Sequence, residues 1–365
     1  MGTQPMEGEN RTPLQRALAA WFPVLVLVVP LAAAALLADL FGSVLTQRAV
    51  IEALIRIVVV VGLYVFTGNS GVISFGSVTF MAVAAYAAGW QTCCTLLKPI
   101  TMPGLPPFLR DQAIALLPAA IASVGLATAA ALLTGLVLMR MSGLAASIST
   151  LAVLFIVNVV YSNWDSVTMG TASMVGLPRY VTVWVAFGAA AAAILAAWLF
   201  QRSARGLLLR ATRADEVAAA ACGVSLYRAR LLAFTLSGAL MGLGGVLTAH
   251  FLGTVSINAF FLKLTFLALA MLVVGGMGSL AGAVVGAVAV SLIIELFRRL
   301  EGGVEIAGQG LSLPAGTQEL VLAAAVLVIL IFRKEGIMGG REFQWPRIKG
   351  KTTGTAMHVA GESEP

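Results

Sequence analysis

The stretch RSARGLLLRATRADEVAAAACG, residues 202–223, is a charged segment in an otherwise apolar chain. It follows the apolar run VTVWVAFGAAAAAILAAWLF, residues 181–200, and another apolar run begins at residue 231. About 20 apolar residues can cross the hydrocarbon core of a bilayer as a helix. The sequence therefore predicts a charged helical segment held outside a membrane between two spans. Such a segment indicates contact with a soluble partner, and it favours a partner-driven permease over a self-contained carrier.

Composition supports a membrane protein. Of the 365 residues, 59% are hydrophobic and 11% are charged, and the mean hydropathy is +0.97. Soluble domains carry about 25% charged residues. The net charge of +7 is typical of basic loops beside a membrane, so no nucleic acid partner is expected. Cys93 and Cys94 are adjacent in an apolar stretch and Cys222 is distant, so we expect no disulfide, no metal site and no other cofactor.

The apolar runs predict an all-α polytopic membrane protein with about ten transmembrane helices, the eighth and ninth short and glycine-broken. The expected spans are residues 21–40, 50–66, 72–96, 113–138, 144–161, 181–200, 231–252, 264–274, 281–296 and 320–332. The first span has no cleavage pattern and is interpreted as retained. The domain prediction is a cytoplasmic N-terminal segment (1–20), a permease domain (21–340) with a cytoplasmic loop at about 201–230, and a disordered cytoplasmic tail (341–365).

The distribution of lysine and arginine predicts the orientation. With the N-terminus inside, the inner loops and tails hold about twice as many basic residues as the outer loops. The positive-inside rule therefore predicts that both termini and residues 202–223 face the cytoplasm of a bacterial plasma membrane. Arg298 and Arg299 fall on the outer side against this rule, where Glu295 and Glu301 are available to pair with them.

Two spans are interrupted by glycine and small polar residues: FTGNSGVISFGS at residues 66–77 and VGGMGSLAG at residues 274–282. One interpretation is close helix packing, since Gly278, Gly282 and Gly286 recur every four residues. The other is a discontinuous helix that lines the translocation path, and paired broken segments indicate a two-fold internal repeat. The candidate path residues are Gly68, Asn69, Ser70, Ser74, Gly76, Gly275, Gly276 and Gly278.

Charges inside the spans are few. Glu52 and Arg56 are four residues apart, so they share a helix face and can form an ion pair. An intramembrane charge is a functional candidate, but this pair lies near the start of its span and is neutral overall. No span carries the series of acidic or histidine residues expected of a proton relay, which argues against a proton-driven carrier.

The end of the charged segment has the features of a docking helix. Asp215 and Glu216 at its start suit the helix dipole, and Gly223 is a natural C-terminal stop. The alanines between them make a small-faced helix that can enter a groove of another protein. The alternative is an amphipathic helix that rests on lipid headgroups, but no aromatic or leucine stripe follows Leu209.

Over residues 50–340 the chain resembles the permease subunit of high-affinity branched-chain amino acid ABC importers, the LivM-like type. The resemblance rests on the ordered motifs TGNSG–SFG (67–76), STLA (149–152), NWDSVTMG (163–170), ATRADEVAAAACG (211–223), GGMGSLAG (275–282) and FRKEG (332–336). It implies a helical inner-membrane permease that performs no covalent chemistry. It also implies a second related permease, two cytoplasmic ABC ATPases, and a periplasmic or lipid-anchored binding protein that delivers an amino acid substrate. The residues that it assigns to the ATPase-coupling helix, together with the arginine that opens it, are Arg213, Asp215, Glu216, Ala219, Ala220 and Gly223.

The sequence departs from that family at residues 170–173, GTAS, where a second glycine is usual. The resemblance implies a branched-chain amino acid (leucine, isoleucine or valine) as the substrate, and this departure adds related small amino acids and amides as candidates. The alternatives are an ABC permease for urea or a sugar, and a secondary carrier or channel.

Overall fold

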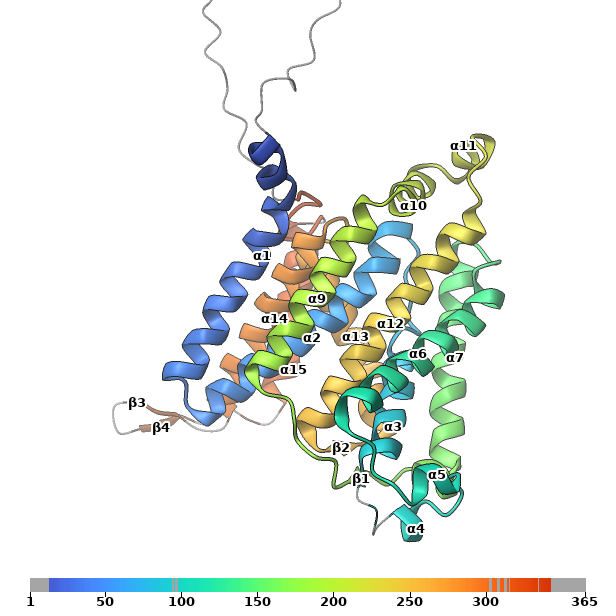
Figure 1. Ribbon diagram of the computed structural model, residues 1–365. Coiled ribbons are helices and arrows are strands. Elements are labelled where there is room, and N and C mark those ends of the chain that lie inside the picture. The colour runs from blue at the N-terminus through green and yellow to red at the C-terminus, as the bar shows by residue number, and fades with distance from the viewer. Residues whose placement is uncertain are drawn as a thin grey trace, which may run out of the picture.

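The computed structural model describes residues 13–342, apart from residues 94, 96, 97, 302, 303, 307, 308, 312, 313, 315 and 334. Every predicted apolar run coincides with a helix (Figure 1). The long helices are α1 (Pro13–Phe41), α2 (Val44–Ser70), α3 (Val78–Thr92), α6 (Leu116–Leu138), α7 (Gly143–Asn163), α9 (Val183–Arg202), α12 (Leu226–Leu252), α13 (Leu262–Gly275), α14 (Leu280–Glu301) and α15 (Thr317–Phe332).

Short elements connect these helices. They are α4 (Lys98–Thr101), α5 (Pro107–Arg110), α8 (Asp165–Thr168), α10 (Ala204–Ala214), α11 (Glu216–Ala221), the 3₁₀ turn η1 (Ile257–Phe260), and the strands β1 (Met174–Val175), β2 (Thr254–Val255), β3 (Val304–Ile306) and β4 (Gln309–Leu311). β1 pairs antiparallel with β2, Met174 opposite Val255, and β3 pairs antiparallel with β4. The helices α10 and α11 stand at one end of the bundle, and β1 and β2 lie at the other (Figure 1).

Within the described residues, eight helices are long and apolar enough to cross a membrane. The helices α3 and α15 are shorter, with 15 and 16 residues. The eighth predicted span is a short helix, since α13 has 14 residues, and the preceding turn η1 lengthens the apolar span to 19 residues. The expectation of a short ninth span was wrong, because α14 runs for 22 residues to Glu301. The predicted ninth span ended too early because hydropathy falls at the charged residues Glu295, Arg298 and Arg299. The helix itself continues, because Glu295 pairs with both arginines.

The helix α1 begins at Pro13, inside the predicted N-terminal segment, and its candidate membrane span begins at Trp21, where the first span was expected. Proline suits the first turn of a helix, where its missing N–H has no intrahelical partner. Residues 1–12 lie outside the described part of the chain, as does the predicted tail from residue 343 onward.

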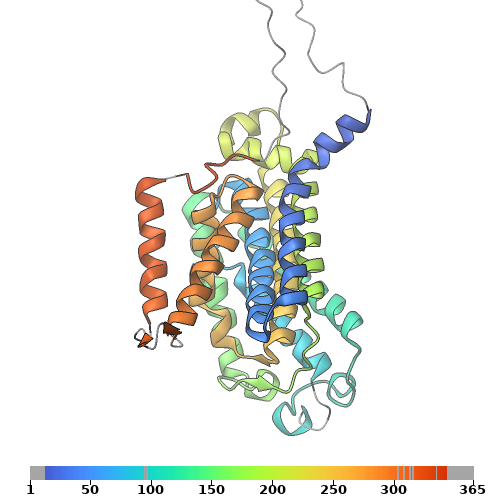
Figure 2. The same ribbon diagram turned by 90° about the vertical axis from the view of Figure 1, so that its left-hand side faces the viewer.

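The helices pack as two similar sets around a central pair. The helices α2 and α12 lie side by side and run in opposite directions (Figure 1). Just as α12 packs against α3 and α6, α2 packs against α13 and α14, and α3 contacts α6 as α13 contacts α14. The helices α7 and α15 lie outermost in their sets, and Figure 2 shows α15 at one edge beside α14. This is the packing expected of two inverted four-helix repeats.

The centre of the bundle is buried on all sides. Every residue of α2 from Ile57 to Ser70 is buried, as expected for a helix that is apolar around its whole circumference. The hydroxyl of Ser237 on α12 donates a hydrogen bond to the carbonyl oxygen of Gly62 on α2 at 2.7 Å. Small residues at this crossing let the two backbones approach closely.

Candidate functional site

The charged segment forms two helices, not one. The helix α10 ends at Ala214, and Asp215 takes an extended conformation with φ of −155° before α11 begins. The Asp215 carboxylate accepts hydrogen bonds from the N–H groups of Val217 at 2.8 Å and Ala218 at 2.9 Å. An N-cap of this kind satisfies donors that the first turn leaves free, so Asp215 interrupts one helix and starts the next. Gly223 has a φ of +82°, which confirms the predicted stop.

The short helix α11 exposes most of its surface. Ala219 is buried, whereas Ala220 and Gly223 are exposed. Val217 is 80% exposed, and Ala218 and Ala221 are exposed beside it. The exposed side of α11 is therefore a small apolar surface, and α11 stands at the extreme end of the bundle (Figure 1).

Three polar contacts fix α10 and α11 to the transmembrane helices. The guanidinium of Arg213 donates to the carbonyl oxygen of Gly68 at the end of α2. Arg210 Nη2 donates to the carbonyl oxygen of Gln201 at the end of α9, at 2.6 Å. Glu216 on α11 forms an ion pair with Arg230 on α12, whose side chain is only 4% exposed. Because Arg230 is buried, its stability in the fold depends on this counterion.

The first glycine segment breaks the third predicted span. The helix α2 ends at Ser70, Gly71 takes a left-handed conformation with φ of +76°, and the chain stays non-helical until α3 begins at Val78. Most of residues 72–77 are buried. Irregular backbone at membrane depth is tolerated only where protein or a water-filled cavity surrounds it. This observation supports the discontinuous-helix interpretation for the first segment.

Hydroxyl groups supply the hydrogen bonds that this irregular backbone needs. The Ser70 Oγ accepts from the N–H of Val72 at 3.2 Å, and the Thr67 Oγ1 accepts from the N–H of Ser74 at 3.3 Å. The Thr150 Oγ1 on α7 accepts from the N–H of Phe75 at 3.2 Å. Thr67 and Thr150 were not among the predicted site residues, because nothing in the sequence shows which backbone they face.

The segment is also packed closely. A Cβ atom on Gly76 would lie 2.1 Å from the carbonyl oxygen of Thr150, so only glycine fits there. The Ser77 hydroxyl donates to the Ser74 hydroxyl at 2.8 Å. Asn69 is fully buried, and its Nδ2 donates to the carbonyl oxygen of Val65 at 3.0 Å while its Oδ1 accepts no hydrogen bond from the described residues.

We expect Thr150→Val to destabilise the protein by about 1–3 kcal/mol, because it leaves the partly buried N–H of Phe75 without an acceptor. The thermal unfolding midpoint of the purified protein in detergent measures this effect. Thr128→Val is the matched control, because the Thr128 hydroxyl bonds only to its own helix at Val124. Equal midpoints for both variants would contradict the role of Thr150.

The second glycine segment is a tight turn between two packed helices. A Cβ atom on Gly275 would lie 1.9 Å from the carbonyl oxygen of Gly282, and one on Gly286 would lie 2.0 Å from that of Met271. Gly276 has a φ of +112°. These contacts favour the close-packing interpretation here. Gly278 precedes α14, so it does not belong to the predicted helical face, which consists of Gly282 and Gly286.

A segment near the C-terminus covers this turn. The N–H groups of Ile337 and Met338 donate to the carbonyl oxygens of Val274 at 2.9 Å and Gly275 at 3.1 Å. The Glu342 carboxylate then accepts from the N–H of Leu280 at 2.6 Å, so it caps α14. Residues 341 and 342 therefore belong to the folded body, which corrects the predicted start of the tail. The cap was missed because it is contributed by a residue 62 positions further along the chain.

The two glycine segments and the charged segment meet at one end of the bundle. Gly68 lies against the second segment, because a Cβ atom there would be 2.8 Å from the carbonyl oxygen of Met277. The same Gly68 accepts the hydrogen bond from Arg213. Gly68 therefore contacts both α10 and the second glycine segment. Gly76 packs against Thr150 of α7, and Gly275 packs against Gly282 and Gly286 of α14.

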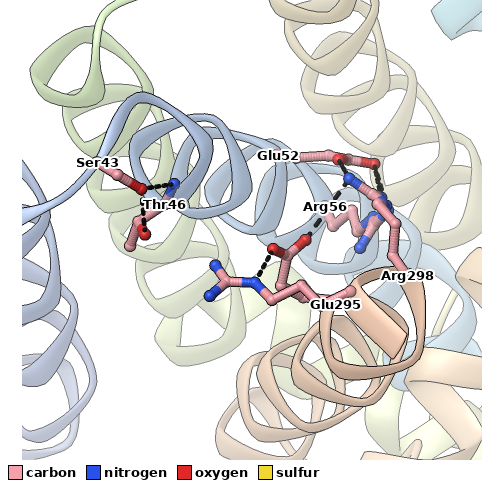
Figure 3. Close-up of polar contacts among 7 residues, drawn as sticks. Ser43, Thr46, Glu52, Arg56, Glu295 and Arg298 are labelled. Carbon is pink, nitrogen blue, oxygen red and sulfur yellow. Dashed lines mark hydrogen bonds and ion pairs between the residues drawn. The ribbon is translucent and has the colours of Figure 1, made fainter. Parts of the chain in front are cut away.

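A cavity of about 310 Å³ lies toward the opposite end of the bundle, and none of the predicted path residues lines it. Apolar side chains from α2, α3, α12 and α13 form most of its wall, and Glu52, Arg56 and Arg298 contribute charge. The predicted pair of Glu52 and Arg56 is confirmed, and Arg298 joins it at 3.0 Å from Glu52. Figure 3 shows these side chains converging from α2 and α14. Among the described residues, no group of histidine, cysteine or acidic side chains is placed to hold a metal ion.

Comparison with known proteins identifies the family of this chain. Residues 45–332 match the family model described as branched-chain amino acid transport system / permease component. The chain is similar to the high-affinity branched-chain amino acid transport system permease protein LivM of Salmonella typhimurium (strain LT2), with 31% identity over 133 residues. Its similarity to the LivM protein of Escherichia coli (strain K12) is 30% identity over 133 residues. Each alignment spans 36% of this chain and 28% of the relative's length.

No solved structure matches the chain. The family match covers most of the residues that form the helical bundle, from the start of α2 to the end of α15. It includes the charged segment, both glycine segments and the cavity. This polytopic membrane protein therefore belongs to the family of branched-chain amino acid transport system permease components.

Proposed function

We propose that this chain is a transmembrane permease subunit of an ATP-driven ABC importer for leucine, isoleucine and valine or related small amino acids. The observation that carries the proposal is that α10 and the exposed helix α11 are fixed to the central helices. Arg213 of α10 binds the end of α2, and Glu216 of α11 pairs with Arg230 of α12. A pair of short helices that is exposed on one side and bound to the central helices on the other is suited to transmit movement from a soluble partner.

The proposed mechanism is alternating access without covalent chemistry. A cytoplasmic ATPase binds the surface of Val217, Ala218, Ala220 and Ala221, and its movement shifts α10 and α11. Arg213 carries this movement to Gly68, where both glycine segments meet. Tightly packed interfaces have discrete arrangements, so a small shift there can switch the path between open and closed.

The proposed assembly contains two ABC ATPases, a second related permease and a periplasmic or lipid-anchored binding protein in a bacterial plasma membrane. ATP hydrolysis takes place in the ATPases. The end of the bundle with α10 and α11 faces the cytoplasm, and so do both termini. The basic residues of α10 (Arg205, Arg210 and Arg213) support this orientation through the positive-inside rule.

The experiment that tests the proposal is purification of the tagged full-length chain from its native membrane in mild detergent. We expect ATPase subunits and a second permease to co-purify, and leucine with its binding protein to stimulate ATP hydrolysis. A chain that purifies alone and transports without ATP would support the secondary carrier instead. Stimulation by urea or a sugar, and not by leucine, would support an ABC permease with a different substrate.

A further inference from the structure

The cavity near Glu52 combines an apolar wall with an excess of positive charge. Its wall contains one carboxylate, Glu52, and two guanidinium groups, Arg56 and Arg298, so the lining carries a net charge of +1 (2 − 1). Most of the remaining lining residues are apolar, among them Val59, Leu267 and Met271. A volume of about 310 Å³ suits a small molecule.

Arg56 has unused hydrogen-bonding capacity. In the part of the chain that the structure describes, only its Nη2 is paired, with Glu52, although a guanidinium carries five N–H donors. The Arg56 side chain is 15% exposed, and it lines the cavity. Glu52 pairs with both Arg56 and Arg298. Arg298 also pairs with Glu295 at 3.6 Å, whereas Glu52 is the one carboxylate paired with Arg56 among the described residues. A carboxylate of a ligand would complete this arrangement, because guanidinium groups bind carboxylates in bidentate geometry.

The cavity reaches from one end of the bundle into its middle. Leu252 and Leu264 lie at the ends of α12 and α13 that are farthest from α10 and α11, whereas Met81 and Met271 lie deeper in their helices. The charged side chains gather toward the end of the bundle, where α2 begins and α14 ends (Figure 3). A ligand with a charged end and an apolar end would therefore lie with its charged groups at the mouth and its side chain inward.

We infer that this cavity is an entry site for an amino acid with an apolar side chain, whose α-carboxylate binds Arg56 and whose α-ammonium lies beside Glu52. The inference rests on the proposed function, because it assigns the substrate a place in this chain. A neutral urea or sugar would use neither charge.

Cysteine protection tests the inference. Thr248 lines the cavity, and Thr248→Cys is introduced into a full-length chain whose three native cysteines are replaced by alanine. The chain is kept in vesicles of its native membrane, and the rate of labelling by anionic sulfonatoethyl methanethiosulfonate is measured. We expect L-leucine to slow the labelling, 4-methylpentanoate, which lacks the ammonium, to slow it less, and leucinamide, which lacks the carboxylate, to have no effect.

Substitutions identify the group that binds. Arg56→Gln is expected to raise the leucine concentration needed for protection about tenfold to a hundredfold, as for the loss of a hydrogen bond to a charged group. Arg299→Gln is the matched control, because Arg299 pairs with Glu295 but does not line the cavity. A second readout needs no ligand: without leucine, the anionic reagent should react faster than its cationic trimethylammonioethyl counterpart, and Arg56→Gln should reduce this ratio about fivefold.

The outcomes separate this inference from the proposed function. If uptake of leucine is ATP-dependent but leucine gives no protection and Arg56→Gln transports normally, the entry site is wrong and the importer stands. If leucine protects Thr248→Cys but uptake needs no ATP, the site stands and the importer is wrong. Slower labelling in nanodiscs with phosphatidylglycerol than in phosphatidylcholine, without any effect of leucine, would identify a lipid headgroup site and overturn the inference.

Discussion

Replacing Glu216 with arginine is expected to reduce ATP-dependent uptake at least tenfold while the protein still inserts into the membrane. The substitution places a cation beside Arg230, whose side chain is buried at 4% exposure. Loss of a hydrogen bond to a charged group costs about 1.5–3 kcal/mol, and the repulsion adds to this. Because Glu216 is itself 42% exposed, solvent screens part of the effect, so we expect α11 to detach from α12 rather than the bundle to unfold.

Uptake of radiolabelled leucine in membrane vesicles, together with ATP hydrolysis by the purified complex, measures this effect. The double variant Glu216→Arg with Arg230→Glu restores an ion pair of opposite polarity, and we expect it to recover part of the uptake. Arg228→Glu is the control for a charge change nearby, because Arg228 is exposed on α12 and forms no ion pair within the described residues. Wild-type uptake by Glu216→Arg would show that α11 does not transmit movement through this pair.

Replacing Gly275 with alanine is expected to be the most destabilising change of a single methyl group. The new Cβ atom would lie 1.9 Å from the carbonyl oxygen of Gly282 and 2.8 Å from the backbone nitrogen of Gly286. Both obstacles are backbone atoms, so α13 and α14 must separate. Overpacking in a core costs about 1–3 kcal/mol, and we expect the upper end of this range because no side chain can move aside.

The thermal midpoint of the detergent-solubilised protein, followed by fluorescence-detected size-exclusion chromatography, measures this loss. Gly188→Ala in α9 is the matched control, since nothing lies within 4 Å of the added Cβ atom. Alanine is favoured over glycine in a helix interior by about 0.5–1 kcal/mol, so the control should raise the midpoint while Gly275→Ala lowers it. The same direction of change for both variants would contradict the close approach of α13 and α14.

The predictions from sequence succeeded where the signal is local. The apolar runs located every long helix, because a helix that crosses a bilayer needs about 20 consecutive apolar residues. Asp215 and Gly223 marked the start and end of α11 through capping chemistry that involves only their own neighbours. The pair of Glu52 and Arg56 followed from helical spacing alone.

Predictions that needed distant contacts were incomplete. The end of α14 was placed too early, because its charges pair along the helix and Arg298 also pairs with Glu52, 246 positions away. The ordered body was ended at residue 340, although Glu342 caps α14. Gly278 was assigned to a helical face that begins only after it. The cap of α14 in particular depends on a contact between residues far apart in the sequence, which no local pattern shows.

By itself, the sequence determined that this chain is a bundle of membrane helices with a charged segment outside the membrane and two glycine segments that interrupt the apolar spans. Hydropathy, caps and glycine act within one helix, so they can be read without knowing the fold. Only the tertiary structure decided that Arg213 reaches Gly68, that both glycine segments meet there, and that the charged cavity lies toward the other end. These contacts depend on how helices cross, and the crossing is set by side chains from several helices packing together rather than by any one segment.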